Sequence, residues 1–366
     1  MSRIESDVYN RRAGVDVALP YSRMFAGLIP WYGILVTCGM GLSIWLAGRE
    51  EKRLGLPADT AVDLALVVIP FGVLGARVYY VLMSWGEFES APLSVFYIWN
   101  GGLAIYGGVI GGIAAAWIYA RRKNLSFSKI ADMVAPGLLL AQGVGRWGNY
   151  FNMEAYGPQI TEPSLQFFPF GVLIPSAAGN VWHMATFFYE SLWNLTGFCM
   201  LWGIRKKQKD SGNIFCWYLL IYGSGRFVIE QLRQDSLYIG SFRASQWLSL
   251  VLCITAAVIL LKRSFAGTRK FITVTACTVL WLLRWSLLDE PAFYALVLLI
   301  TGMVSIWLLR NEKSIRLLVM MLALDVAGLL VYLAKVPAAD FVHSLLCSLT
   351  LVGYVMALCM KNKDER

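Results

Sequence analysis

The sequence predicts an all-α fold, a polytopic bundle of helices that crosses a membrane many times. Apolar residues make up 58% of the 366 residues and charged residues only 15%, whereas soluble domains carry roughly 25% charged residues. Apolar runs of about twenty residues recur from one end of the chain to the other, and each can cross a hydrocarbon layer about 30 Å thick. A soluble protein could not cover this much apolar surface, so we expect an integral membrane protein.

Eleven apolar runs are the predicted spans. They cover about residues 28–48, 61–83, 101–120, 130–150, 181–203, 213–232, 245–261, 271–288, 292–309, 317–334 and 341–360. The first run follows the polar residues 1–27 and lacks a small-residue cleavage site. We therefore expect an uncleaved first span, preceded by a segment outside the membrane or at its surface.

Basic residues predict the orientation. With the N-terminus outside, the cytoplasmic segments carry 21 of the 32 Lys and Arg residues and the outside segments carry seven. The positive-inside rule therefore favours an outside N-terminus and a cytoplasmic C-terminus. Residues 84–99 and 151–180 contain no Lys or Arg, and 151–180 holds four prolines. We expect 151–180 to form a small extracytoplasmic cap of short irregular pieces.

Composition also excludes several classes of function. Basic cytoplasmic loops explain the net charge of +9, so we do not expect nucleic-acid binding. The seven cysteines lie in apolar runs without a CxxC pair, and the only histidines are His183 and His343. No metal site, cofactor or disulfide framework is predicted. His343 is interpreted as structural, while His183, near the start of the predicted fifth span, is more often structural than catalytic.

Ionisable residues within a membrane are costly and usually face an interior cavity. Here they gather in the first seven predicted spans. They are Asp63, Arg77, Asp132, Arg146, Glu154, Glu190, Arg226, Glu230 and Arg233. The last four spans carry few such residues, and the chain has no convincing internal repeat.

The segment 145–157 reads GRWGNYFNMEAYG and places polar groups at the end of the fourth span. It contains Arg146, Asn149, Asn152 and Glu154. A guanidinium is a planar fork that matches a phosphate, so the segment favours a phosphate site at the outer leaflet. An internal ion pair of Arg146 with Glu154 or Asp132, which would only join helices, explains the residues equally well.

The segment 222–233 reads YGSGRFVIEQLR and likewise places polar and charged residues in a predicted span, the sixth. Arg226 and Glu230 are four residues apart, with Tyr222 one turn before and Arg233 close behind, so they share one helical face. Such a stripe favours a polar cavity. The alternative is an intrahelical ion pair with Arg233 reaching the membrane surface.

The segment 100–112, NGGLAIYGGVIGG, contains overlapping GxxxG patterns from Gly107 and Gly108. Alone, such patterns most often indicate tight helix packing. Tyr106 precedes them, and its phenol would be an unusual base because its free pKa is about 10.

Together these segments resemble the prolipoprotein diacylglyceryl transferases of bacteria. GRWGNYFNMEAYG is similar to the family signature G-R-x-G-N-F/Y-x-N-x-E-x-x-G, and YGSGRFVIEQLR to the block Y-G-x-x-R-x-x-x-E-x-x-R. Weaker matches follow in family order across about residues 28–263. They are WYGI at 31–34, GARVYYV at 75–81, NGGLAIYGG, Asp132 with Pro136, and FFYESLWN at 187–194.

The resemblance implies a seven-span transferase core over residues 28–265, with the cap at about 151–180. Residues 270–366 would be a C-terminal membrane extension of about four spans, whose function it does not explain. It also implies transfer of the diacylglyceryl group of phosphatidylglycerol to the lipobox cysteine of a prolipoprotein signal peptide. The product is a thioether, and glycerol phosphate is released at the bacterial cytoplasmic membrane.

The resemblance assigns the site residue by residue. Arg146 and Arg226 would hold the lipid phosphate. The catalytic set would be Arg146, Arg226, Glu154, Tyr106, Tyr222 and Glu230. The lipid-binding set would add Asn149, Asn152, Gly157, Arg233, Gly107 and Gly108.

Two points stay open at this stage. Many family members have histidine where this chain has Tyr106. Either Tyr106 donates a hydrogen bond to the lipid while Glu154, Tyr222, His183 or bound water accepts the thiol proton, or base catalysis at this position is unimportant. A transporter or flippase of anionic lipid is the alternative function, although paired halves with broken helices would then be expected. A third reading is a degenerate relative that only binds lipid or signal peptide.

Overall fold

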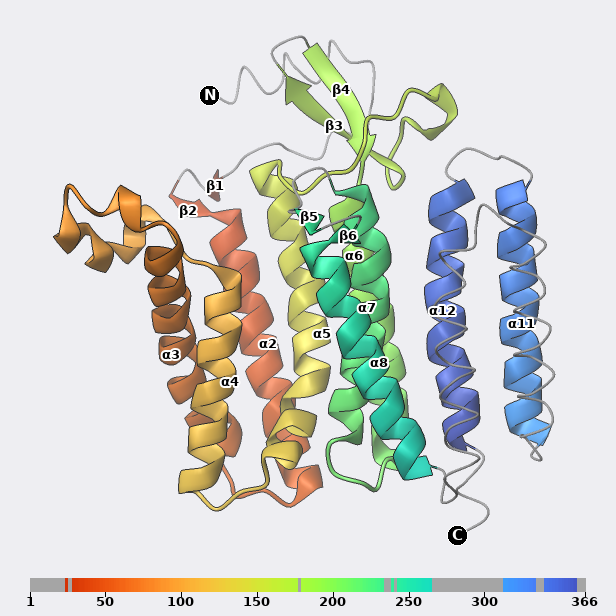
Figure 1. Ribbon diagram of the computed structural model, residues 1–366, viewed down its shortest axis with the longest axis horizontal. Coiled ribbons are helices and arrows are strands. Elements are labelled where there is room, and N and C mark those ends of the chain that lie inside the picture. The colour runs from red at the N-terminus through yellow and green to blue at the C-terminus, as the bar shows by residue number, and fades with distance from the viewer. Residues whose placement is uncertain are drawn as a thin grey trace. The chain divides into compact units, whose positions relative to one another are not determined.

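The computed structural model describes residues 24–25, 28–176, 179–233, 238–239, 242–264, 312–333 and 339–360. These residues are mostly helical (Figure 1). The helices are α2 Trp31–Leu54, α3 Thr60–Met83, α4 Ile105–Arg122, α5 Phe127–Asn152, α6 Thr186–Ile204, α7 Asn213–Leu232, α8 Ala244–Ser264, α11 Glu312–Leu333 and α12 Ala339–Met360. Short 3₁₀ helices cover Trp85–Glu87, Pro92–Phe96, Ile98–Asn100, Pro163–Leu165 and Arg205–Lys207.

Six strands pair into three antiparallel two-stranded sheets. They are β1 Met24–Phe25 with β2 Ile29–Pro30, β3 Gly171–Ser176 with β4 Gly179–Met184, and β5 Tyr238–Ile239 with β6 Phe242–Arg243. The expectation of an all-α chain therefore holds for the helical body, and the sheets are small additions to it.

The chain forms two compact units. The first contains Met1–Cys38, Gln142–Leu201 and Cys216–Arg366, and the second contains Gly39–Ala141 and Trp202–Phe215. The boundaries fall within α2, α5, α6 and α7, so each of these helices contributes residues to both units.

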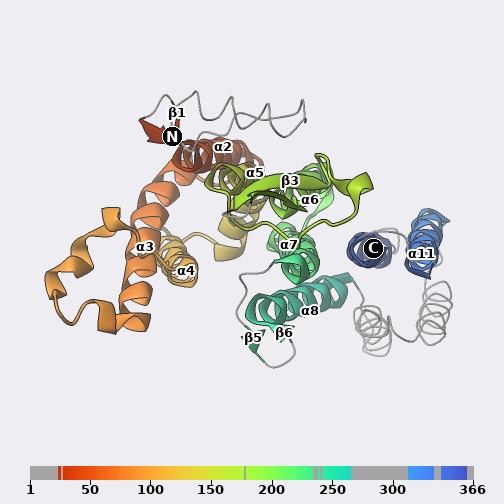
Figure 2. The same ribbon diagram turned by 90° about the horizontal axis from the view of Figure 1, so that it is seen from above.

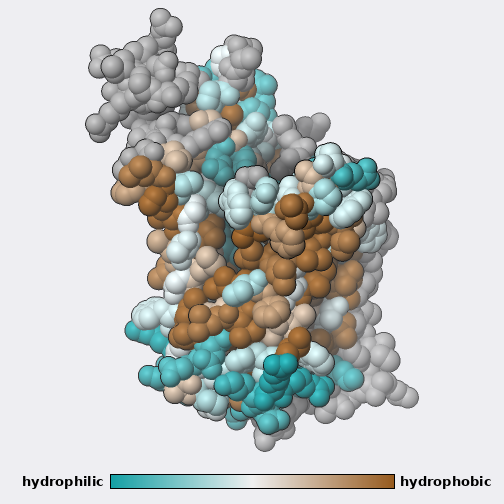
Figure 3. Space-filling view, turned by 90° about the vertical axis from the view of Figure 1, so that its left-hand side faces the viewer, coloured by the Kyte–Doolittle hydropathy of each residue, from teal (hydrophilic) through white to brown (hydrophobic). Residues whose placement is uncertain are grey.

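The helices have the length and surface of a membrane protein. Among the described residues, α2, α3 and α8 are each long and apolar enough to cross a membrane. In the second unit, large apolar side chains gather on the outer face of α3 and α4 (Figure 3). Leu66, Phe71, Leu82, Ile110 and Trp117 are each at least half exposed on these helices. Such a surface is stable where lipid surrounds it, so the protein is a helical membrane protein.

The described helices coincide with nine of the eleven predicted spans. The seven helices from α2 to α8 match the first seven apolar runs, and α11 and α12 match the last two. The predicted spans 271–288 and 292–309 lie outside the described residues, as do residues 1–23 of the predicted N-terminal segment.

The start of the predicted fifth span is wrong. Residues from Gly179 to Met184 form β4, in which His183 lies opposite Val172 of β3, and α6 begins only at Thr186. An apolar run does not by itself distinguish a strand from a helix. His183 consequently lies in the cap rather than at the end of a helix.

The cap is also more ordered than the irregular pieces expected for 151–180. Besides the β3–β4 hairpin, the backbone N–H groups of Gly157 and Ile160 donate to the carbonyls of Met184 and Trp182, at 2.9 and 2.8 Å. The hairpin lies over the ends of α5 and α6 (Figures 1 and 2). Its Val172 and Ile174 pack into one apolar cluster with Tyr150 and Phe187, which fixes the cap to those helices.

Tight packing of α3 against α4 defines the second unit. A Cβ at Gly107 would lie 2.3 Å from the carbonyl oxygen of Gly75, and one at Gly111 would lie 2.6 Å from that of Phe71. No larger residue fits without moving a backbone. The GxxxG pattern therefore packs two helices, as such patterns usually do.

Arg77 of α3 holds the loop that leads to α4. Its buried guanidinium donates to five main-chain carbonyls, those of Ser94, Val95, Gly101 and Gly102 at 2.7 to 3.0 Å and that of Tyr97 at 3.5 Å. Gly101 and Gly102 have φ of 87° and 72°, a region that glycine enters without strain. For this reason α4 begins at Ile105, four residues after the start of the predicted third span.

Three helices surround a short segment of α7 in the first unit. A Cβ at Gly223 would meet Sγ of Cys253 on α8 at 2.7 Å, and one at Gly225 would meet the indole of Trp193 on α6. Between them, the carbonyl of Ser224 accepts a hydrogen bond of 3.0 Å from the hydroxyl of Ser348 on α12. The segment between Tyr222 and Arg226 is thereby fixed from three sides.

Candidate active site

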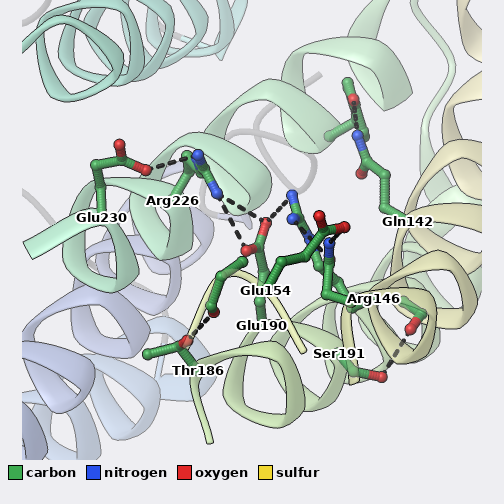
Figure 4. A network of polar contacts seen from close by, with 12 residues as sticks. Gln142, Arg146, Glu154, Thr186, Glu190, Ser191, Arg226 and Glu230 are labelled. Carbon is green, nitrogen blue, oxygen red and sulfur yellow. Dashed lines mark hydrogen bonds and ion pairs between the residues drawn. The ribbon is translucent and has the colours of Figure 1, made fainter. Parts of the chain in front are cut away.

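Two arginines from different helices meet at one buried carboxylate. Arg146 of α5 places Nη2 2.7 Å from Oε1 of Glu190, and Arg226 of α7 places Nη1 3.1 Å from Oε2 of the same residue. Arg226 also pairs with Glu230 one turn along α7, at 2.6 Å. Figure 4 shows both guanidinium groups directed at Glu190 of α6. We call Arg146, Glu190, Arg226 and Glu230 the ionic cluster.

The partner of Arg146 is a residue that sequence reasoning did not place in the site. The pairing considered from the sequence was with Glu154 or Asp132, but the ion pair forms with Glu190. Asp132 lies in the second unit, where it accepts hydrogen bonds from the N–H groups of Gly212 and Phe215 at the start of α7. The sequence signals for Glu190 were an acidic residue within an apolar run and its place in the weaker family match FFYESLWN.

Exposure decides which groups of the cluster a ligand can reach. Glu190 is 3% exposed, whereas the side chains of Arg146 and Arg226 are 22% and 16% exposed. The carboxylate thus lies behind the two guanidinium groups. An anion would meet the arginines first, already oriented by charge-assisted hydrogen bonds from behind.

A turn after α5 returns Glu154 to the polar side chains of that helix. Nδ2 of Asn149 donates to Oε1 of Glu154 at 2.8 Å, and Nδ2 of Asn152 donates to the same oxygen at 3.3 Å. Oδ1 of Asn149 in turn accepts from Nη1 of Arg146 at 3.3 Å. Glu154 is therefore an exposed carboxylate that is linked through one amide to the ionic cluster.

The turn that carries Glu154 has an unusual backbone. Met153 and Ala155, on either side of it, have φ of 54° and 55°. The left-handed region costs a non-glycine residue roughly 1–2 kcal/mol. Backbone hydrogen bonds from Met153 and Glu154 to the carbonyls of Tyr150 and Asn149 hold the turn in place. Strain of this kind persists where the surroundings impose it, often at functional sites.

Gly157 ends the signature segment in close contact with the cap. A Cβ there would lie 2.9 Å from side-chain atoms of both Met184 and Thr186. The hydroxyl of Thr186 donates to the carbonyl of Ala155, and Nδ1 of His183 lies 2.8 Å from the carbonyl of Gly157. Gly157 and His183 thus fix the segment to β4 and α6, and the predicted lipid contact of Gly157 stays a prediction.

The remaining predicted residues of α7 lie on or next to the cluster. Tyr222 stands one turn before Arg226 and is partly exposed. Its ring stacks on Tyr218, with centroids 5.8 Å apart. Arg233 follows the last residue of α7, and its N–H donates to the carbonyl of Glu230 at 3.2 Å.

Tyr106, Gly107 and Gly108 belong to the second unit, at the start of α4. Tyr106 is 43% exposed, and Gly107 has the packing contact with α3 described above. Their part in the site stays a prediction. The described residues contain no group of three or more metal-ligating side chains.

Comparison with known proteins identifies the family. The family model for prolipoprotein diacylglyceryl transferase matches residues 23–262. A *Bacillus cereus* protein named phosphatidylglycerol–prolipoprotein diacylglyceryl transferase is 42% identical over 243 residues, which cover 65% of this chain and 88% of the relative. A *Bacillus anthracis* protein of the same name is 41% identical over 239 residues, with the same coverage. The chain belongs to the prolipoprotein diacylglyceryl transferase family.

Proposed function

We propose that Arg146 and Arg226 hold the phosphate of phosphatidylglycerol while its diacylglyceryl group passes to the cysteine thiol of a prolipoprotein. The protein is a phosphatidylglycerol–prolipoprotein diacylglyceryl transferase, as its family and its 42% identity to an enzyme of that name establish. The single observation that carries the phosphate assignment is the pair of partly exposed guanidinium groups aligned on Glu190.

The reaction explains why two arginines are needed. The thiolate sulfur attacks the glyceryl carbon that bears the phosphate, a C–S bond forms, and the C–O bond to the phosphate breaks. The bond electrons leave with glycerol phosphate, whose phosphate group carries more negative charge than the original diester. Cationic donors placed before the reaction stabilise this developing charge without reorganising.

Glu190 orients the arginines in this mechanism rather than touching the lipid. Its Oε1 accepts from Arg146 at 2.7 Å and from Arg226 at 3.4 Å, and its Oε2 accepts from Arg226 at 3.1 Å, so the two guanidinium groups are fixed relative to one another. Glu230 gives Arg226 a second anchor on its own helix. Because productive geometry tolerates little displacement, holding both cations in place raises the rate.

Glu154 is the proposed acceptor of the thiol proton. The thiolate is the nucleophile, so a base must take the proton. The described hydrogen bonds to Glu154 come from the neutral amides of Asn149 and Asn152, whereas Glu190 and Glu230 are paired with arginine. Of these three carboxylates, Glu154 is thus the one held by neutral amides, and it is exposed to an incoming peptide.

We place the reaction at the outer face of the bacterial cytoplasmic membrane. The proposed core of seven spans covers residues 28–265, with the N-terminus outside, the cap at about 151–180 and the C-terminus in the cytoplasm. The distribution of Lys and Arg supports this orientation. Residues 270–366 would add a membrane extension to this core.

The test uses purified full-length protein, phosphatidylglycerol vesicles and a peptide with a lipobox cysteine. Mass spectrometry of the peptide should detect the diacylglyceryl adduct on the cysteine. Arg146→Ala and Arg226→Ala should each abolish the adduct while the protein stays folded. Arg122→Ala, which removes an exposed arginine at the end of α4, serves as the control and should keep turnover. Turnover at the control level in either cluster variant would refute the phosphate assignment.

A further inference from the structure

A second layer of polar residues lies one helical turn beyond the ionic cluster. Gln142 precedes Arg146 by four residues on α5, Asn194 follows Glu190 by four on α6, and Tyr222 precedes Arg226 by four on α7. Residues four apart share a helical face. We call Gln142, Asn194 and Tyr222 the second polar layer.

On each of the three helices, the second polar layer lies farther from the cap than the ionic cluster does. Arg146 and Arg226 each lie six residues before the end of their helix, and Glu190 lies four residues after the start of α6. Those three helix ends face the cap hairpin (Figure 1). With a rise of 1.5 Å per residue, the second polar layer is about 6 Å farther from these ends. In the proposed orientation it is deeper in the membrane.

Asn194 is the residue that points to a ligand. Its side chain is only 1% exposed. Within the described part of the chain, neither its Oδ1 nor its Nδ2 has a hydrogen-bond partner. A buried polar group without a partner destabilises the fold, and an apolar residue at this position would avoid that cost. The amide therefore matches a group that the protein alone does not supply.

The neighbours of Asn194 in the layer are also neutral hydrogen-bonding groups. Nε2 of Gln142 donates to the hydroxyl of Tyr218 at 3.0 Å, while its Oε1 has no partner among the described residues. Gln142 and Tyr222 are both partly exposed, so a bound molecule can approach the layer beside these two side chains, while Asn194 lies buried behind them. The N–H groups of Asn194 and the hydroxyl of Tyr222 are donors that suit a neutral acceptor, whereas a phosphate requires the cations of the ionic cluster.

We propose that the second polar layer binds the ester carbonyl groups of the lipid substrate. The inference rests on the proposed function, in which Arg146 and Arg226 hold the phosphate. In a diacyl phospholipid the two esters lie on the hydrocarbon side of the phosphate, separated from it by the glycerol backbone. The N–H groups of Asn194 and the hydroxyl of Tyr222 donate to these carbonyl oxygens, and the layer selects ester-linked over ether-linked lipid.

The experiment compares two lipids that differ only in these carbonyls. Purified full-length protein receives phosphatidylglycerol with two ester-linked chains, or its analogue with two ether-linked alkyl chains of equal length, together with the lipobox peptide. The ratio of kcat/KM for the two lipids is measured by mass spectrometry. We expect the wild type to favour the diester about tenfold or more, the factor for leaving a buried donor unpaired.

Asn194→Leu should bring this ratio close to one. Leucine is apolar and of similar size, so replacing an unpartnered amide should not lower the thermal unfolding midpoint. Tyr222→Phe should lower the ratio as well and provides the test if Asn194→Leu does not fold. The control is Ser191→Ala on the same helix, because the hydroxyl of Ser191 is already satisfied by the carbonyl of Gly143 at 2.7 Å. It should keep the wild-type ratio.

Two outcomes would overturn the inference alone. One is equal use of diester and diether by the wild type. The other is a wild-type ratio in folded Asn194→Leu, which would mean that water satisfies the amide. An absence of adduct from the diester itself would instead overturn the proposed function and the inference with it.

Discussion

Glu190→Gln separates the orientation of the two arginines from their charge. The substitution keeps the shape of the side chain but turns one oxygen, which now accepts from a guanidinium at 2.7 or 3.1 Å, into an amide donor. Removing one partner of a buried ion pair costs about 3–5 kcal/mol. Because glutamine keeps one acceptor oxygen, we expect roughly half of this loss, about 1.5–2.5 kcal/mol of transition-state stabilisation. That corresponds to a fall in kcat of about 10- to 70-fold.

The KM for phosphatidylglycerol should move differently from kcat. Glutamine removes a negative charge behind the two guanidinium groups, so the anionic lipid should bind equally well or more tightly. The assay measures adduct formation against lipid concentration. Glu162→Gln is the matched control, because Glu162 is an exposed cap residue that contacts Ser164. A wild-type kcat in Glu190→Gln, or a raised KM with unchanged kcat, would refute the orienting role.

Three further predictions concern other parts of the chain. Tyr106→Phe tests the phenol that replaces a common family histidine: unchanged adduct formation would remove it from the mechanism, and a loss of more than tenfold would place it there. Deleting residues 271–366 should leave turnover but lower the thermal unfolding midpoint, since α12 no longer packs against α8. A folded but inactive protein would contradict the prediction that the core is active without the extension. Arg77→Lys should expose the loop between α3 and α4 to protease, because a single ammonium cannot replace the five hydrogen bonds that the guanidinium donates to this loop. A hydrogen bond from a charged donor contributes about 1.5–3 kcal/mol. A cleavage rate equal to that of Arg122→Lys would contradict this role.

Residue types and periodicity predicted the helical body but not the cap hairpin. The helices follow from apolar runs of membrane length, which few other structures can accommodate. Between Val181 of β4 and Phe188 of α6 the chain is largely apolar, with only His183 and Thr186 as polar residues, so no periodicity separates the strand from the helix. What decides the boundary is pairing with β3 and with residues 157–160, a contact that single-sequence reasoning does not contain.

The sequence indicated the two arginines of the candidate site, Arg146 and Arg226, but not the carboxylate of Glu190 that lies between them. Arg146 and Arg226 were recognisable because arginine within an apolar run requires a polar function. Glu190 carried the same kind of signal, but its role depends on two helices that approach it from either side. From the sequence, an ion pair of Arg146 with Glu154 of the same segment was one of the pairs considered, because the two residues are close along the chain. Long-range geometry therefore decided which carboxylate the arginine meets.

The hydrogen bond between α12 and α7 bears on how the extension could join the core. Ser348 donates to a main-chain oxygen, that of Ser224, and every amino acid offers the same acceptor. This contact makes no demand on the side chain at position 224. A helix can therefore make this contact whatever side chain stands at position 224, and the residues between Tyr222 and Arg226 remain free to be chosen by the chemistry of the site.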